Sequence, residues 1–503
     1  MSYSEQELIR REKLHHLQSL GIDPYPAPLF PVSHYSEDAK AAYEQNKEVT
    51  LDVVIAGRAM SINDKGKVFF IKLQDAKGIL QCYIKRDDIC TGEDKTLFDE
   101  VVKKADLGDI FGVKGYMFTT KTGEVSVHAR EVILLAKSLK PLPVVKRDEE
   151  GNVFDEVTDP EFRYRQRYAD LIINPMVKET FVKRSTMVNS IRTFLNAMGA
   201  LEVDTPVLQS IPGGAAARPF ITHHNALDIP FYLRIANELY LKRLIVGGFD
   251  FVYEFSRNFR NEGMDRTHNP EFTVLEFYVA YKDYIWMMET TEQLLEKVAL
   301  DTNGTTSIQV GEQVIEFKAP YQRVSIYDAI KTHTGVDVSG MNEDELRQTC
   351  KQLHIAVDDT MGRGKLVDEL FGEKCEHHYF QPTFITDYPV EMSPLTKKHR
   401  SKPGLVERFE LMVNGKEIAN AYTELNDPVD QRERFEEQSK LMERGDDEAM
   451  FIDYDFLRAL EYGMPPTAGI GFGIDRLAML MTNNQSIQDV LLFPQMRPEK
   501  TNS

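Results

Sequence analysis

The stretch from Phe251 to Tyr281 constrains the fold most, because it has the alternation of two β-strands joined by a polar loop. In the first strand, Glu254, Ser256 and Asn258 share one parity and lead to Arg260, while aromatic residues hold the other parity. Successive strand side chains point to opposite faces. One face is therefore predicted to bury itself and the other to carry polar groups. Taken alone, the pattern also fits an amphipathic hairpin with a solvated turn.

The second strand of this stretch places a carboxylate among apolar neighbours. Pro270 opens it, a position that strands tolerate, and Phe272, Val274, Glu276 and Tyr278 share one face. A charge in apolar surroundings is unfavourable unless it is paired. We therefore expect Glu276 to have a cationic or donor partner, and the shared face to be the floor of a binding site.

Length and net charge limit the classes of protein to which this chain can belong. A chain of 503 residues with 42% hydrophobic residues is expected to hold two or more domains. The net charge of −19 argues against a protein whose whole surface is basic and binds nucleic acid nonspecifically. It does not exclude a local basic surface. We find no membrane-length apolar run and no signal-peptide pattern, so we expect a cytoplasmic protein. The cysteines lack metal-ligand spacing and are expected to be reduced: Cys82, Cys90, Cys350 and Cys375.

The distribution of residue types along the chain predicts its domains. Residues 1–50 read as a helix and a proline-rich extended lead-in, and residues 141–176 as a linker. Short β runs separated by turn signals fill residues 51–140, which predicts a small Greek-key barrel of the oligonucleotide-binding (OB) kind. Such barrels stack bases on aromatic side chains. The barrel alone leaves nucleic-acid binding open, because this shape serves many roles.

Residues 177–503 read as one large α+β domain with a helical insertion at about 324–380, in which we find no chemistry. A long helix is expected from Val177 to Gly199, followed by a strand broken at Pro206. Ile211 to Phe220 is a loop of small residues that lets a ligand approach the backbone. The arginine-rich segment from Asp159 to Pro175 either contacts phosphates or holds two domains together.

Two later segments suggest ligand chemistry. Glu417 and Glu424 offer the hard oxygen ligands that Mg²⁺ prefers near phosphates. They are seven positions apart, so a regular strand aims them at opposite faces and a bulge or bend is needed. Further on, Gly469, Gly471 and Gly473 alternate, which makes one strand face a flat shelf for a planar ring. The dinucleotide pattern GxGxxG is absent, because no third glycine follows at the required spacing.

Three segments together resemble a known family. FRNEG with RTHNPEF (259–263 and 266–272) resembles motif 2 of class II aminoacyl-tRNA synthetases, and GIGFGIDRLAML (469–480) resembles motif 3. The long helix with MGALEVDTPVL (198–208) resembles motif 1. The preceding barrel is similar to that of subclass IIb, and the resemblance to bacterial lysyl-tRNA synthetases runs nearly end to end. It implies an OB-fold barrel followed by an antiparallel catalytic sheet flanked by helices.

The resemblance also implies ATP-dependent ligation of lysine to tRNA(Lys) through a lysyl-adenylate, with Mg²⁺, in a homodimer. The implied catalytic residues are Arg260 and Arg476. The implied lysine ligands are Gly214, Glu238, Arg260, Glu276, Tyr278 and Asn426. The implied ATP ligands are Arg260, Glu262, His268, Phe272, Gly471, Gly473 and Arg476. The implied Mg²⁺ ligands are Glu417 and Glu424. The implied anticodon-reading residues are Arg58, Phe70, Gln81 and Glu124.

The chain departs from the family at a few positions. Ala419 and Ala421 stand where the bacterial enzymes usually carry glycines, a change expected to narrow the pocket around the lysine side chain. Asn237 replaces a familiar proline with little expected effect. In motif 1, Ala200 and Leu201 stand where an aromatic residue is common, and that motif is mainly a dimer element.

Charge chemistry agrees with these roles. A carboxylate that attacks an α-phosphate brings two anions together, so Arg260, Arg476 and Mg²⁺ are needed to offset the charge. Glu276 suits a substrate ammonium, whereas an aspartate pocket needs a cation there.

The alternatives are an aspartate or asparagine enzyme, a relative that lysylates a protein, and a non-catalytic RNA-binding or signalling protein on an inactive synthetase scaffold. The inactive scaffold predicts loss of Arg260, Arg476 or the carboxylates, and all are present.

Overall fold

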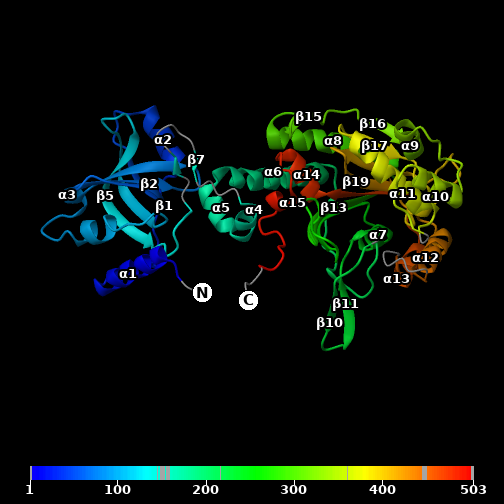
Figure 1. Ribbon diagram of the computed structural model, residues 1–503, viewed down its shortest axis with the longest axis horizontal. Coiled ribbons are helices and arrows are strands. Elements are labelled where there is room, and N and C mark those ends of the chain that lie inside the picture. The colour runs from blue at the N-terminus through cyan, green and yellow to red at the C-terminus, as the bar shows by residue number, and fades with distance from the viewer. Residues whose placement is uncertain are drawn as a thin grey trace. The chain divides into compact units, whose positions relative to one another are not determined.

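The computed structural model describes residues 3–143, 146–147, 153–154, 159–215, 217–358, 361–443 and 450–499 (Figure 1). Part of the predicted linker and Ala216 of the small-residue loop lie outside these residues. The chain divides into two compact units, Met1–Val157 and Thr158–Ser503. The finer domain boundaries expected from the sequence remain predictions.

The first unit is built around a closed barrel with the strand order β1-β2-β3-β5-β4. Its strands are β1 (Asp52–Asp64), β2 (Val68–Gln74), β3 (Ile79–Lys85), β4 (Ile110–Thr119) and β5 (Val125–Ala136). The remaining elements are α1 (Glu5–Ser19), α2 (Ser36–Gln45), α3 (Arg86–Ile89), η1 (Leu97–Val102), β6 (Lys146–Arg147) and β7 (Val153–Phe154). The predicted OB-type barrel is confirmed. Alternation along β2 buries Phe69 in the core and leaves Phe70 partly exposed on the outer face.

The second unit contains an eight-stranded sheet with the order β16-β17-β18-β19-β20-β13-β12-β8. These strands are β8 (Leu201–Glu202), β12 (Phe251–Phe259), β13 (Glu271–Ala280), β16 (Gln322–Ser325), β17 (Thr383–Thr386), β18 (Arg408–Val413), β19 (Lys416–Thr423) and β20 (Thr467–Gly473). Helices α6 (Pro175–Ala197), α8 (Tyr284–Asn303) and α14 (Ile474–Met481) supply residues to the core on its apolar face. The α+β class and the mainly antiparallel sheet flanked by helices are as predicted.

The central strands separate an apolar face from a polar one. Leu275 and Phe277 of β13 pair with Phe472 and Ile470 of β20, and all of them lie in the large core cluster. The other parity of the same strands carries Glu276 and the shelf glycines. The two-faced strands predicted from 251–281 are therefore present, with the polar face directed away from the core.

Ala419 and Ala421 correct one expectation. They pair with Phe472 and Ile470, and both are buried in the same core cluster. Because they occupy the apolar parity of β19, their methyl groups point away from the polar face. The prediction that they narrow the lysine pocket is wrong.

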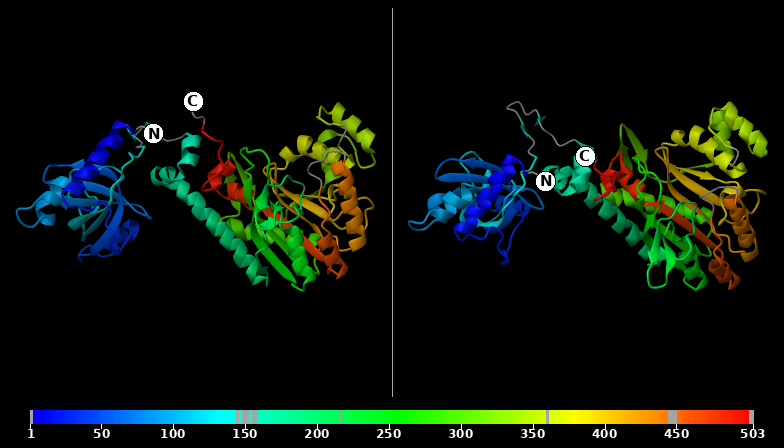
Figure 2. Two further views of the ribbon diagram at one scale, coloured as in Figure 1. Left: turned by 90° about the horizontal axis from the view of Figure 1, so that it is seen from below. Right: turned by 60° about the horizontal axis from the view of Figure 1, so that its bottom comes forward.

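Smaller elements surround the sheet. The hairpin β10 (Ile221–His224) and β11 (Ile229–Leu233), which pairs with β9 (Leu208–Gln209), projects from the body of this unit (Figure 1). The insertion contains α9 (Ile326–Thr334), α10 (Glu343–Gln352), α11 (Arg363–Lys374) and η2 (Glu376–His378) around its own core (Figure 2). The other elements are α7 (Glu238–Val246), β14 (Ser307–Val310), β15 (Gln313–Glu316), η3 (Val390–Met392), α12 (Pro428–Glu443), α13 (Tyr454–Glu461) and α15 (Ile487–Val490).

The arginine-rich segment 159–175 forms α4 (Pro160–Arg165) and α5 (Arg167–Ile173). Arg167 is fully buried, pairs with Asp170 at 2.5 Å, and donates to the carbonyl oxygens of Gln488 and Leu492. It therefore anchors the C-terminal segment within this unit and is not available to phosphates. No helix among the described residues is long and apolar enough to cross a membrane.

Candidate active site

A cavity of about 1150 Å³ opens over the polar face of the central sheet. Across its floor, Glu276 of β13, Gly471 of β20 and Asn420 of β19 lie side by side in register. One step along, Tyr278, Gly469 and Tyr422 form a second row. Because neighbouring strands lie about 4.8 Å apart, Gly471 leaves a gap about 10 Å wide between the side chains of the two flanking strands. This gap accommodates an extended or planar ligand.

The shelf glycines are not equivalent. A Cβ on Gly469 would overlap the carboxylate of Glu424 and the ring of Tyr278, so only glycine fits there. A Cβ on Gly471 would lie 3.7 Å from Cγ of Glu276, an ordinary contact, and one on Gly473 would lie 3.6 Å from Cδ of Arg476. Gly469 is thus required by packing, whereas Gly471 and Gly473 keep space open for a ligand.

Glu276 lies deep in the floor with little exposure. The hydroxyl of Tyr278 donates to its Oε2 at 3.0 Å, and no cation pairs with it among the described residues. Burial, reinforced by the charge of Glu238, raises the pKa of Glu276 to about 8. The predicted donor partner is present, while the position for a cation is left to a ligand.

A second carboxylate pair surrounds a buried lysine. Nζ of Lys242 lies 2.5 Å from Oε1 of Glu238, four residues earlier on α7, and also pairs with Glu424. Burial alone lowers the pKa of Lys242, but the two carboxylates more than offset this, so its pKa is raised. The hydroxyl of Tyr422 donates to Glu238 at 2.6 Å. Gly214 adjoins this pair, since a Cβ there would lie 3.3 Å from Cβ of Glu238.

These groups form what we term the acidic cluster: Arg234, Glu238, Lys242, Glu254, Glu276 and Glu424, all of them buried. Arg234 pairs with Glu254 at 2.7 Å, which leaves Lys242 as the cation for the other carboxylates. When all are ionised, carboxylates outnumber cations in the cluster by two. Buried charges are stable only when compensated, so the cluster favours a ligand that carries two positive groups.

The opposite end of the cavity is cationic. Arg260 follows β12, and its guanidinium lies over the ring of Phe272, 5.1 Å from the centroid. Its buried Nε has no hydrogen-bond partner among the described residues, and burial lowers its pKa. A buried donor without a partner is costly, so Arg260 is suited to an anionic ligand in the cavity.

Arg476 lies in the first turn of α14 and continues this cationic end. It donates to the carbonyl oxygen of Glu417 at 2.8 Å, and its Nη2 lies 3.3 Å from Nε2 of His268. Nδ1 of His268 contacts Asp265 at 2.8 Å, which fixes the loop after β12. Glu262 lines the cavity from the same loop. Most of the residues predicted to bind ATP are therefore gathered at this end, whereas Gly471 lies on the floor beside Glu276.

The predicted metal pair does not converge. Glu417 lies near the start of β19 and Glu424 follows its last residue, so they are roughly 20 Å apart along the strand. Glu424 is fully buried beside Lys242, whereas Glu417 lines the cationic end, with Oε2 3.7 Å from Arg476. The bulge in the pairing of β19 with β18 does not bring them together. These two carboxylates do not fit one Mg²⁺.

Glu410 of β18 is the carboxylate that accompanies Glu417 in the cavity. Burial raises its pKa to about 7 against the opposing effect of Arg408, and the charge of Glu417 raises it further. Two carboxylates that repel each other in a cavity form a donor set that a divalent cation neutralises. The sequence prediction did not include Glu410. Arg408 and Glu410 are two positions apart and so share one face of β18, and this polar face was a signal that could have identified Glu410.

Asn426 is also misplaced by the sequence prediction. It lies beyond β19, where its Oδ1 accepts from Lys397 at 2.7 Å and its Nδ2 donates to the carbonyl oxygen of Met464 at 2.9 Å. It is not among the residues that line the cavity, whereas Asn420 is. The sequence reasoning also missed Lys242 and Tyr422. The i,i+4 spacing of Glu238 and Lys242 was a signal for that ion pair.

The outer barrel face of the first unit carries an aromatic group. Phe70 and Tyr83 have ring centroids 5.4 Å apart, and Tyr83 lies 4.9 Å from His128. Nearby on the same strands, Gln81 donates to Ser126 at 2.9 Å. Glu124 pairs with Lys72 at 2.8 Å, and Arg58 donates to the carbonyl oxygen of Gly108 at 2.8 Å. The predicted anticodon residues therefore lie outside the barrel core, and Phe70 belongs to the aromatic group itself, whereas Arg58 lies further along β1, opposite Gln74.

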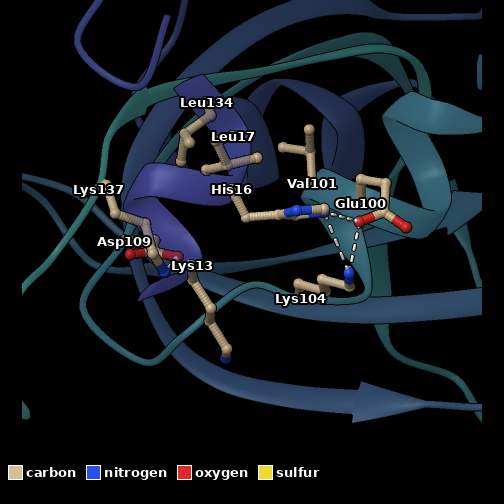
Figure 3. Close-up of a pocket in the computed structure, with 9 residues that line it drawn as sticks. All are labelled: Lys13, His16, Leu17, Glu100, Val101, Lys104, Asp109, Leu134 and Lys137. Carbon is tan, nitrogen blue, oxygen red and sulfur yellow. Dashed lines mark hydrogen bonds and ion pairs between the residues drawn. The ribbon is translucent and has the colours of Figure 1, made fainter. Parts of the chain in front are cut away.

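A small pocket between α1 and the barrel is not a ligand site (Figure 3). Its volume is about 10 Å³, enough for at most one water. His16 lies 2.5 Å from Glu100, which also pairs with Lys104. These contacts fasten α1 to the first unit.

Comparison with known proteins shows the family to which this chain belongs. Residues 159–497 match the model for tRNA synthetases class II (D, K and N), and residues 53–135 match the OB-fold nucleic acid binding domain. The chain belongs to the class II tRNA synthetases of this group. Its curated relatives include proteins named lysine--tRNA ligase. One from Porphyromonas gingivalis W83 is 66% identical over 502 residues, which is 99% of this chain and 87% of the relative.

Two further relatives carry the same name. The Christiangramia forsetii protein is 65% identical over 498 residues, covering 99% of this chain and 87% of the relative. The Azobacteroides pseudotrichonymphae protein is 61% identical over 498 residues and covers 99% of both chains. The similarity therefore spans both units.

Proposed function

We infer that this chain joins L-lysine to tRNA(Lys) at the expense of ATP, through a lysyl-adenylate, with release of pyrophosphate and AMP. The acidic cluster carries the inference, because its two excess carboxylates complement the α- and ε-ammonium groups of lysine. Glu276 and Tyr278 face the shelf where the lysine side chain lies, while Glu238 and Gly214 receive the α-ammonium. The relatives named lysine--tRNA ligase support the same substrate.

Glu424 takes a different role in this proposal from that expected from the sequence. Its Oε2 pairs with Lys242, whereas its buried Oε1 has no hydrogen-bond partner among the described residues and lies close to the ring of Tyr278. An ammonium at that position satisfies an otherwise uncompensated acceptor. We therefore assign Glu424 to the lysine ε-ammonium site and replace Asn426 with Asn420 as the amide of the pocket.

Activation brings the lysine carboxylate to the α-phosphate of ATP. The nucleophile is already ionised, so no protein base is required. Arg260 bridges the two anions with its free Nε, and Phe272 stacks on the adenine over the shelf. Arg476 and His268 hold the outer phosphates. Fixed cations that meet developing negative charge without reorganisation are the main source of rate enhancement in such reactions.

Mg²⁺ is proposed as the cofactor, held by Glu410 and Glu417. This pair suits the ion, because Mg²⁺ in nucleotide sites takes one or two carboxylates and completes its coordination with phosphates and water. Bound there, the ion would offset negative charge on the phosphates.

Transfer requires the 3′-terminal ribose of tRNA at the same cavity and the anticodon at the barrel. We propose that Phe70 stacks on an anticodon base and that Arg58, Gln81 and Glu124 read base edges, since polar side chains and aromatic rings select unpaired bases. We further propose a cytoplasmic homodimer, as the resemblance implies.

The experiment is ATP–pyrophosphate exchange with Mg²⁺ and each of the twenty amino acids in turn. Exchange with lysine alone is expected, and Arg260→Ala should abolish it while the protein remains folded, because its Nε has no described partner. Glu289→Gln, at an exposed position on α8, is the matched control. Exchange with aspartate or asparagine would refute the pocket assignment. A folded protein without exchange would favour the inactive scaffold.

A further inference from the structure

Arg408, at the start of β18, is a largely buried arginine that the reaction described above does not use. Its side chain is only 12% exposed, and it lies over the ring of Tyr388, 4.5 Å from the centroid. Its guanidinium donates to four acceptors: Met392 O at 3.0 Å, Ser393 Oγ at 2.9 Å, Glu410 Oε1 at 2.5 Å and Asn420 Oδ1 at 3.0 Å. It therefore connects the cavity floor to the segment around η3.

The contact with Asn420 fixes the direction of that amide. A guanidinium has only donors, so the Asn420 atom that faces Arg408 must be Oδ1. Nδ2, with its two hydrogens, is then turned away from Arg408. Asn420 lines the cavity beside Gly471, and no described residue accepts from its Nδ2. The amide thus presents unused donors to a ligand.

The other end of Arg408 holds a tightly packed wall. Met392 belongs to η3, which packs against α11 of the insertion. A Cβ on Gly364 of α11 would lie 3.0 Å from Cγ of Met392 and 3.2 Å from Cβ of Glu391. Arg408 is therefore held between a close-packed wall and the floor, which leaves its guanidinium little freedom to turn.

We propose that Arg408 is a positioning residue that holds the Asn420 amide with Nδ2 toward an anionic oxygen of the substrate. That oxygen belongs either to the α-carboxylate of the amino acid or to the α-phosphate of ATP. The inference rests on the proposed function, since it assumes lysine activation in this cavity. Without Arg408, nothing in the described residues prevents the amide from rotating, and the donor is lost to the substrate.

The test is a double-mutant cycle of Arg408→Met and Asn420→Ala, with two readouts: lysine affinity without ATP and kcat of lysine-dependent exchange. A hydrogen bond to a charged group corresponds to a loss of about 10- to 100-fold. Each single change is expected to lower one readout by that factor, and the double variant should be no worse than Asn420→Ala. All variants are compared at saturating Mg²⁺, because Arg408 also pairs with Glu410. In Asn420→Ala, which keeps that pair, weaker lysine binding identifies the carboxylate, and a lower kcat with unchanged lysine affinity identifies the phosphate. Effects that multiply, or an unaffected Arg408→Met variant, would overturn the proposal.

Two controls separate positioning from general stability. Asn420→Asp keeps an acceptor for Arg408 but lacks the donor, so it should be as impaired as Asn420→Ala; near wild-type activity would contradict the proposal. Arg434→Met removes a buried arginine that donates to the carbonyl oxygens of Val390 and Ser393 at 3.3 and 3.4 Å. It should lower the thermal midpoint without coupling to Asn420→Ala.

If Arg408→Met does not fold, Arg408→Lys takes its place in the same cycle, because it retains the buried charge but not the forked geometry. Lysine-dependent exchange by the unmodified protein tests the proposed function separately. Its absence would reject lysine activation itself, whereas its presence with independent effects at the two positions would reject only the role of Arg408.

Discussion

Replacing Glu276 with glutamine tests how the pocket recognises an ammonium. In the empty site, burial and the charge of Glu238 raise the pKa of Glu276 to about 8, so the carboxyl is mostly protonated at pH 7. An ammonium from lysine requires the ionised form. Binding of lysine must therefore expel a proton, and lysine affinity should rise as the pH rises towards 8.

The size of the effect follows from this pKa. Below it, each pH unit changes the apparent affinity about tenfold, which gives about 50-fold between pH 6 and pH 8. Near pH 7, the ionisation of Glu276 on lysine binding should by itself release about 0.9 proton. Glu276→Gln cannot ionise, so its affinity should be weaker and should change less with pH over the same range than that of the unmodified protein. Both ammonium groups of lysine remain charged there, so the slope belongs to the protein.

Isothermal titration calorimetry of lysine, in buffers that differ in ionisation enthalpy, measures affinity and proton release together. Glu289→Gln, which changes an exposed carboxylate on α8, should keep the full pH dependence. If the unmodified protein binds lysine with the same affinity at pH 6 and pH 8 and releases no proton, the reasoning about Glu276 is refuted.

Further predictions concern the shelf, the cationic end and the barrel. Gly469→Ala should lower the thermal midpoint sharply because its Cβ overlaps Tyr278, whereas Gly471→Ala should fold normally and lose lysine-dependent exchange; equal stability of the two would contradict the packing argument. Arg476→Ala should raise the KM for ATP at least tenfold and leave lysine affinity unchanged, as measured by exchange kinetics and calorimetry. Phe70→Ala should weaken tRNA binding by about 1–3 kcal/mol without slowing exchange, and a loss of exchange would argue against a role confined to anticodon stacking.

The fold could be predicted largely from local patterns. Alternation in residues 251–281 identified the polar and apolar faces of β12 and β13, because burial on one side imposes a period of two. The glycine alternation at 469–473 identified the shelf, and turn signals identified the barrel. The motif resemblance gathered Arg260, His268, Phe272 and Arg476 at one site, where the structure does bring them together.

Errors arose where a residue's position in three dimensions depends on distant partners. Glu424 and Asn426 lie beyond the end of β19, and their surroundings come from Lys242, Lys397 and Met464, which are distant in sequence. The effect assigned to Ala419 was wrong for a related reason, because the face it occupies is set by pairing with β18 and β20. Parity within one strand does not say which face meets the cavity.

The sequence by itself determined which segments form strands and helices, since hydrophobic period and turn residues act within a few positions. It also determined the chemical groups available for ammonium, phosphate and metal recognition. Only the tertiary structure decided which carboxylates share a space: Glu238, Glu276 and Glu424 around the amino acid, and Glu410 with Glu417 near the phosphates. The reason is physical, because burial and charge pairing are properties of the packed assembly of distant segments, and both vary steeply with distance.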